Sequence, residues 1–291
     1  MSSTEHAAAR FAGIEGWPTD DLAAALLETQ LAAVAAASAS RADLARAIDA
    51  VADRLSRGGR MIYLGAGTSG RLAVLDAAEL PPTFDWPPER AIALMAGGER
   101  AILHAVEGAE DSESAAPAAL AALSLAPADV VIGVAASGRT PYVRAGLAAA
   151  RGLGALTLAI VNAADSPMLR ECDIALLADT GAEIIAGSTR MKAGTAQKVL
   201  LNCLSTGVMI RLGAVYRGRM VQMRPTNAKL QARAIAMVAD LAGVSPDRAA
   251  AALAGGGSIK VAVVMLALGL DAEAARARLG SGNLAEALKG S

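Results

Sequence analysis

Aromatic side chains are scarce in this chain of 291 residues, which holds only two Phe, two Trp and three Tyr. Hydrophobic residues nevertheless make up 54% of the sequence, so Ala, Leu and Val must fill the core. No uninterrupted apolar run reaches the roughly 18 residues of a membrane-spanning helix. The opening "MSSTEHAAARFAG" also lacks the basic start and apolar stretch of a secretory signal. We therefore expect a globular protein with no membrane partner.

Cysteine and histidine are equally rare. Cys172 and Cys203 are too few for a disulfide framework, which favours a reducing, cytoplasmic location. His6 and His104 are the only histidines, and no Cys/His spacing is typical of zinc, so we expect no metal. The formal net charge is −1 and no basic run appears, which argues against nucleic acid as a partner.

Five short apolar runs alternate with helical segments over the middle of the chain. Each run is continuous rather than alternating, which is typical of strands buried on both faces of a parallel sheet. The repeated strand–helix order predicts an α/β protein, a three-layer sandwich with a mostly parallel five-stranded sheet. The predicted strands occupy residues 61–65, 90–97, 129–136, 155–161 and 174–178.

Three regions are expected along the chain. Residues 1–57 should form helices that pack on the sheet domain, because apolar residues recur there at three- and four-residue spacing. Residues 58–235 should form the sheet domain, with a long helix from about 193 to 212. Residues 236–291 should form a small module of three helices, in which Ser245 and Asp271 are suitable N-caps.

Three turns combine glycine, hydroxyl and basic residues: "GAGTSGR" (65–71), "AASGRTPYV" (135–143) and "AGSTRMKAGTAQK" (186–198). Each leads into a predicted helix, whose first N–H groups lack partners and favour an anion. Ligands of open α/β sheets bind at this end of the strands. Any one such turn could instead serve only to let a helix pack close to a strand. Three together predict a site for a phosphorylated sugar, since Ser and Thr suit both phosphate and hydroxyl groups.

Two nucleotide-binding alternatives are disfavoured. A dinucleotide site needs an acidic residue at the end of the next strand, and Glu99 in "MAGGER" lies too far along. The Gly-Lys-Ser/Thr of a phosphate-binding loop in nucleotide hydrolases is absent from the first turn.

Two acidic segments could supply catalytic groups. "LDAAELPPTF" places Glu79 between apolar residues and two prolines, which predicts burial, a raised pKa and a role as proton donor. "AVEGAEDS" places Glu110 in an acidic cluster. The alternative for both is an ordinary solvated acid at a helix end.

The segments "GRMIYLGAGTSGRLAVLDAAELPPTF", "AVEGAEDS", "GVAASGRTPYV" and "GSTRMKAGTAQKVLLNCLSTGVMI" resemble the N-acetylmuramic acid 6-phosphate etherases. These belong to the sugar isomerase (SIS) domain superfamily and are related to the glucokinase regulatory protein. The resemblance covers nearly the whole chain. It implies cleavage of the D-lactyl ether by elimination and water addition in cell-wall amino-sugar recycling, without metal or cofactor, by a homodimer.

The resemblance also implies residue roles. Glu79 matches the proton donor and Glu110 the base, and the two should flank the C2–C3 bond of the sugar. The phosphate should lie on the second turn, and the other turns should hold the rest of the substrate. His104 is expected to be structural or at the rim. The implied binding residues are Ser137, Gly138, Arg139 and Thr140 for phosphate, Thr68, Ser69, Ser188 and Thr189 for the remainder, and Lys229 of "NAKL".

The chain departs from the family pattern in three places, one of which is the stretch "AIVNAADSP", where no catalytic consequence is expected. Leu80 replaces a common cysteine, and the stretch before Lys229 is more basic than usual, which leaves an ordinary surface lysine as the alternative there. Two other functions also remain open: a phosphosugar isomerase and a non-catalytic sugar-phosphate regulator.

Overall fold

The computed structural model describes residues 6–280 and 282–289. By contacts, the chain divides into two compact units. Unit 1 comprises residues 1–78 and 88–205, and unit 2 comprises residues 79–87 and 206–291. The division falls about 30 residues before the predicted boundary at 235–236, because Tyr216, Val221 and Met223 pack with the C-terminal helices.

Unit 1 is built on a five-stranded sheet in which every pairing is parallel, as predicted. The continuous apolar runs form its strands, and β1, β3 and β4 are buried along their whole length. In spatial order the strands are β2 (Ala91–Met95), β1 (Met61–Gly65), β3 (Val130–Val134), β4 (Leu156–Val161) and β5 (Ile174–Leu177).

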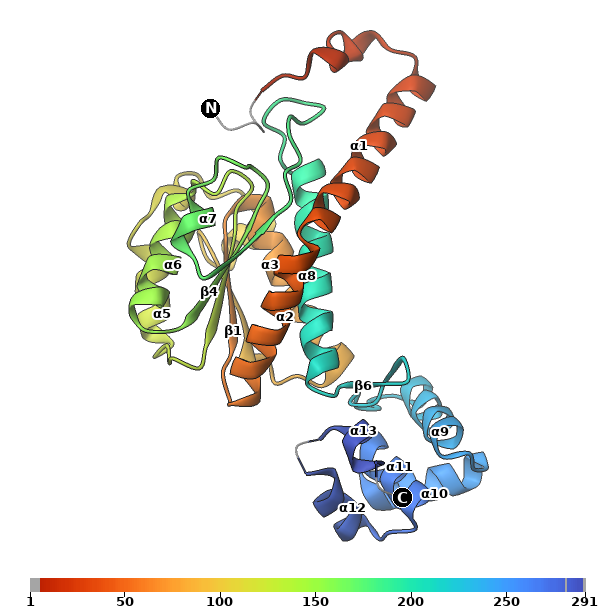
Figure 1. The fold of residues 1–291 in the computed structure, drawn as a ribbon. Helices are drawn as coiled ribbons and strands as arrows, with labels where there is room; N and C mark the ends of the chain where they lie inside the picture. Colours follow the sequence, from red (N-terminus) through yellow and green to blue (C-terminus); the bar gives the residue numbers. More distant parts are fainter. Residues whose placement is uncertain (1–5, 281, 290–291) are drawn as a thin grey trace. The chain divides into compact units, whose positions relative to one another are not determined.

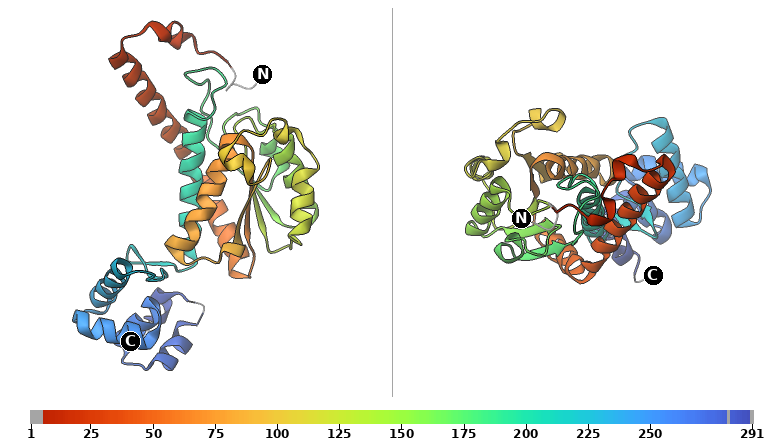
Figure 2. Two further views of the ribbon diagram at one scale, coloured as in Figure 1. Left: turned by 180° about the vertical axis from the view of Figure 1, so that it is seen from behind. Right: turned by 90° about the horizontal axis from the view of Figure 1, so that it is seen from above.

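Helices cover both faces of this sheet (Figures 1 and 2). On one face lie α5 (Ala115–Ala122), α6 (Pro141–Gly152) and α7 (Met168–Glu171). On the other lie α2 (Arg41–Ser56), α3 (Gly67–Phe84) and α8 (Lys192–Arg211). The short α4 (Arg100–Leu103) follows β2. The three-layer sandwich and the long helix near residues 193–212 are thus confirmed.

The core differs between the two faces. Toward α5 and α6, Ile62 and Leu64 of β1 pack in an apolar cluster. Toward α3 and α8, the buried Tyr63 donates its hydroxyl to Asp76, 3.0 Å away, and Ser205 donates to the same carboxyl at 3.2 Å. Burial raises the pKa of Asp76. This polar contact fixes α3 and α8 against the sheet.

Helix α1 (Thr19–Ala39) carries a narrow buried stripe of small residues at four-residue spacing, from Ala25 to Ala37. Leu27 and Leu31 on its other side are 69% and 73% exposed. Among the described residues α1 has the length and apolar composition of a membrane-crossing helix, as does the α10–α11 pair if taken as one span bent by 117°.

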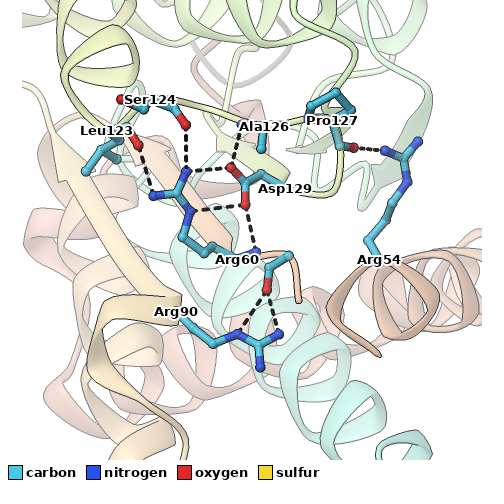
Figure 3. Close-up of polar contacts among 9 residues, drawn as sticks. Arg54, Arg60, Arg90, Leu123, Ser124, Ala126, Pro127 and Asp129 are labelled. Carbon is cyan, nitrogen blue, oxygen red and sulfur yellow. Dashed lines mark hydrogen bonds and ion pairs between the residues drawn. The ribbon is translucent and has the colours of Figure 1, made fainter. Parts of the chain in front are cut away.

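At the amino edge of the sheet, Arg60 and Asp129 form a closed network (Figure 3). The Arg60 guanidinium donates to Asp129 at 3.1 and 2.6 Å and to the Leu123 carbonyl at 3.0 Å. The amides of Arg60 and Ala126 donate to the same carboxylate. Burial by itself would raise the pKa of Asp129, but these hydrogen bonds outweigh it and hold the pKa below the usual value.

Unit 2 contains a two-stranded antiparallel hairpin and a helical bundle with its own apolar core. Within residues 6–280 and 282–289, four helices follow α9 (Ala228–Ala242), where the sequence predicted three in the C-terminal module. Ser245 and Asp271 cap their helices as predicted, each accepting from a backbone amide three residues on. The elements are β6 (Val215–Tyr216), β7 (Arg219–Met220), α9 (Ala228–Ala242), α10 (Pro246–Gly256), α11 (Ile259–Leu268), α12 (Ala272–Leu279) and α13 (Leu284–Ala287).

Candidate active site

A cavity of about 370 Å³ lies at the carboxyl edge of the sheet in unit 1, where the three glycine-rich turns meet. Its volume falls in the range of small-molecule sites. Its walls carry hydroxyl groups, one guanidinium and two carboxylates. The polar lining residues are Thr68, Ser69, Glu110, Asp111, Ser137, Arg139, Thr140 and Thr189. Seven of these eight were predicted site residues; Asp111 was not.

The first turn joins β1 to α3. An added Cβ at Gly65 would lie 2.6 Å from the Gly70 Cα, so both glycines are needed for the chain to pass this close to itself. Thr68 and Ser69 then fall in the first turn of α3, where backbone N–H groups have no acceptor within the helix. The turn therefore offers amides and hydroxyls to one ligand.

The second turn joins β3 to α6. Thr140 is the N-cap of α6, and within the described residues its side chain makes no capping hydrogen bond. Because Pro141 at the first position has no N–H, the amides of Tyr142 and Val143 are the ones available for an anion. Gly138 has φ +63°, and an added Cβ there would lie 1.8 Å from the Ser166 Oγ. Ser166 is 5% exposed, and its Oγ has no hydrogen-bond partner among the residues that the structure describes.

Arg139 extends from the second turn toward the loop after β4. Its guanidinium donates to the Asp165 carboxylate at 2.8 Å and to the Asp165 carbonyl at 3.1 Å. Asp165 carried no signal in the sequence, because nothing along the chain links it to the second turn.

The third turn differs from the other two. The carboxylate of Glu183, which is fully buried, accepts the amides of Lys192 and Ala193 at the start of α8, at 3.0 and 2.9 Å. The start of α8 is therefore already occupied by an internal anion. The sequence held one signal for this role: Glu183 is the only acidic residue between Thr180 and Ala239.

Glu110 lies in the 3-10 turn η5 (Ala109–Asp111), and its side chain faces two neighbouring cavities. The second cavity is about 190 Å³ and shares Ala66, Gly67 and Glu110 with the first. An exposed carboxylate at the junction of two cavities can act on a ligand that extends into both.

Four predicted residues do not line the larger cavity, and one of them is Gly138, although it lies in the second turn. Glu79 is exposed rather than buried, so the prediction of an apolar setting for it is wrong in this chain. The helix places Leu80 and not Glu79 on the buried side. Glu79 and the exposed Lys229 both belong to unit 2, and among the described residues neither lines the two cavities. Ser188 lies in the third turn, yet only its neighbour Thr189 reaches the cavity wall.

Metal-binding groups are not clustered in the part of the chain that the structure describes: no three His, Cys, Asp or Glu side chains there could hold an ion together.

Comparison with known proteins agrees with the fold. The family described as "Glucokinase regulatory protein N-terminal SIS domain" matches residues 43–151, and the family "SIS domain" matches residues 105–206. A phosphoheptose isomerase from Francisella tularensis aligns over 67% of this chain and 100% of its own, with TM-score 0.50 and 19% identity. A phosphosugar isomerase of capsule formation from Bacteroides fragilis, itself described as putative, aligns over 67% and 91% with TM-score 0.50 and 20% identity. The chain is an SIS-domain protein.

Closer relatives define its family within that class. The N-acetylmuramic acid 6-phosphate etherase of Deinococcus radiodurans is 52% identical over 99% of this chain and 95% of its own length. That of Salmonella typhimurium is 48% identical over 91% and 90%. The chain belongs to the N-acetylmuramic acid 6-phosphate etherase family.

Proposed function

We propose that this protein cleaves the D-lactyl ether of N-acetylmuramic acid 6-phosphate to N-acetylglucosamine 6-phosphate and D-lactate. The observation that supports this most is the placement of Glu110 in the same cavity as the open helix starts of α3 and α6. A phosphate-binding edge and a carboxylate base are then within reach of one sugar. Membership in the etherase family supplies the substrate.

The reaction is an elimination followed by addition of water. In the open-chain aldehyde form, the C2 proton is acidic, and Glu110 removes it. The C3–O bond breaks, an acid donates a proton to the departing lactate oxygen, and a C2–C3 double bond forms. Water then adds its hydroxyl to C3 and a proton to C2. One water molecule is consumed, and the base and the acid exchange roles between the two halves.

The phosphate is held at the second turn. Ser137, Thr140 and the first amides of α6 are the donors, and Arg139 adds positive charge beside them. Thr68, Ser69 and Thr189 line the remaining wall and suit the sugar hydroxyls.

We infer that the acid, Glu79, comes from a second copy of the chain. Glu79 follows Gly67 by twelve residues in one helix, which is about 18 Å along the axis. That is longer than a hexose 6-phosphate, and Gly67 lines the cavity. The proposal therefore includes a homodimer in which Glu79 of a second copy completes each site.

Helix α1 offers a surface for that second copy. Leu27, Leu31 and Val34 are exposed at a spacing that places them along one side of the helix, opposite the buried stripe. The N-terminal half of α1 extends past the carboxyl edge of the sheet in Figures 1 and 2. A homodimer would bury this side close to the edge that holds the cavity. We also propose a cytoplasmic location, as the cysteine content favours.

The first test is release of D-lactate from N-acetylmuramic acid 6-phosphate by the full chain, with aldose–ketose exchange of sugar phosphates measured in parallel. Lactate release supports the proposal. Exchange without lactate would support the isomerase, and binding without either reaction would support the regulator.

The second test mixes two inactive variants. We expect Glu79→Gln and Glu110→Gln each to lower kcat by a factor of about 10² to 10⁴ while sugar-phosphate binding persists. Random mixing then creates mixed dimers with one intact site, so activity should return to about a quarter of the wild-type value. No recovery after subunit exchange, verified by differently tagged copies, would show that each site is built from one chain.

A further inference from the structure

The second cavity next to Glu110 is not needed to bind the phosphate, which the second turn accounts for. At about 190 Å³ it is smaller than the usual range for a whole ligand, but it holds several times the volume of one water molecule. It opens beside the base and shares Ala66, Gly67 and Glu110 with the larger cavity. A group attached next to the reacting carbon would therefore enter it.

Arg71 is the half-buried cation of this cavity. Its Nε donates to the Ile102 carbonyl and its Nη2 to the Ala101 carbonyl, both at 2.9 Å. Within residues 6–280 and 282–289, no carboxylate pairs with Arg71 and no acceptor lies at its Nη1. The two carbonyl contacts orient the guanidinium and leave one nitrogen and the full positive charge for a ligand.

The rest of the lining is mostly small and apolar: Met95, Ala96, Ala101, Ala105 and Val106. The other titratable groups at this cavity are His104, Glu107 and Glu110, and all three are exposed. Solvent screens the charges of these exposed carboxylates more than that of the half-buried guanidinium. A short chain with one methyl group and one carboxylate matches such a lining.

We propose that this second cavity binds the lactyl group of the substrate and that Arg71 binds its carboxylate. The inference rests on the proposed etherase function. The lactyl carboxylate is the only anion of that substrate besides the phosphate, and it is attached at C3, next to the C2 carbon that Glu110 deprotonates. The neutral acetamido group at C2 could fill the same volume but would leave the guanidinium without an anion. Arg71 is thus a specificity-determining residue that selects ethers bearing an acid.

The test compares the natural substrate with its lactamide analogue, in which the carboxylate is a neutral amide. We expect the wild-type protein to favour the acid in kcat/KM by about tenfold to a hundredfold, as a hydrogen bond to a charged group would give. Arg71→Met should remove that preference, mainly by lowering kcat/KM for the substrate with the carboxylate. Arg71→Lys should keep part of the preference. Arg100→Met removes the charge of an exposed arginine that lines neither cavity and should keep the full preference.

Binding of N-acetylglucosamine 6-phosphate, which lacks the lactyl group, separates this role from a structural one. It should be unchanged in Arg71→Met and Arg71→Lys. An equal loss of kcat/KM for the acid and the amide, together with weaker binding of this product, would show that Arg71 only positions the backbone carbonyls of residues 101 and 102. That result would overturn the proposal. So would a wild-type protein without preference for the acid. Failure of the wild type to release any lactate would instead overturn the etherase function itself.

Discussion

The two edges of the central sheet differ in how fully their polar groups are hydrogen-bonded. At the amino edge, Asp129 is nearly inaccessible, and the Arg60 guanidinium and two backbone amides share its carboxylate (Figure 3). At the carboxyl edge, within the described part of the chain, the helix starts of α3 and α6 keep unused amides and the Ser166 hydroxyl has no partner.

The difference shows where the molecule gains stability and where it keeps binding capacity. Unsatisfied polar groups cost free energy in the folded state unless a ligand or water completes them. The Arg60–Asp129 network fixes the starts of the strands at the amino edge. The sheet can therefore carry hydrogen-bond donors without acceptors at its carboxyl edge. Changes at the carboxyl edge should therefore alter activity, and changes at the amino edge should alter stability.

The largest effect is expected for Glu110→Gln at the carboxyl edge. Loss of the base should lower kcat by a factor of about 10² to 10⁴, because general base catalysis contributes that much. Thermal unfolding should be unchanged, since the side chain is exposed. Lactate release and a melting curve are the measurements. Activity within a factor of three of wild type would remove Glu110 from the mechanism.

Gly138→Ala should come next. The new Cβ meets the Ser166 Oγ in a backbone region that disfavours side chains, so the second turn must move. We expect kcat/KM to fall about 30-fold or more through weaker phosphate binding, a cost of about 2 kcal/mol. Gly152→Ala is the matched control, because no atom of the described residues lies within 4 Å of its added Cβ and its φ is not positive. Similar KM values for the two variants would contradict this account of the turn.

Asp129→Ala tests the amino edge. It leaves the partly buried Arg60 guanidinium without its anion, and the free energy of unfolding should fall by about 3 kcal/mol. Turnover below the melting temperature should equal that of wild type. A denaturant titration read beside the lactate assay measures both. A loss of kcat with stability retained would mean that the two edges are coupled.

The smallest effect is the dependence of stability on pH. The folded state lowers the pKa of Asp129 below 3.8, so the ionised carboxylate stabilises the fold above that value. This contribution is lost as the pH falls below 3.8 and through the folded-state pKa. Wild type should therefore lose stability over this acidic range more steeply than Asp129→Asn, as followed by urea unfolding. If the free energy of unfolding of the two proteins changed with pH in the same way, the Asp129 carboxylate would not contribute to the pH dependence of stability.

Much of the fold was predictable because it follows from local pattern. The strand at Met61–Gly65 was expected with those limits, and α8 within one residue of each end. The boundary of the C-terminal unit was not predicted, because no pattern in residues 206–235 indicates whether they pack with the sheet or with the C-terminal helices. The candidate site divides the same way: Ser137 and Thr140 were found from their turn, whereas Asp165 meets Arg139 only through the loop after β4.

The sequence by itself determined the buried parallel strands, the glycine-rich turns at their carboxyl ends and the acids worth testing, because spacing and residue type act over a few neighbours. Only the tertiary structure decided that Glu183 occupies the start of α8, that Glu79 is exposed far along α3, and that Arg71 faces a second cavity. Those outcomes depend on contacts between residues distant in the chain, and burial and charge pairing are set by such contacts.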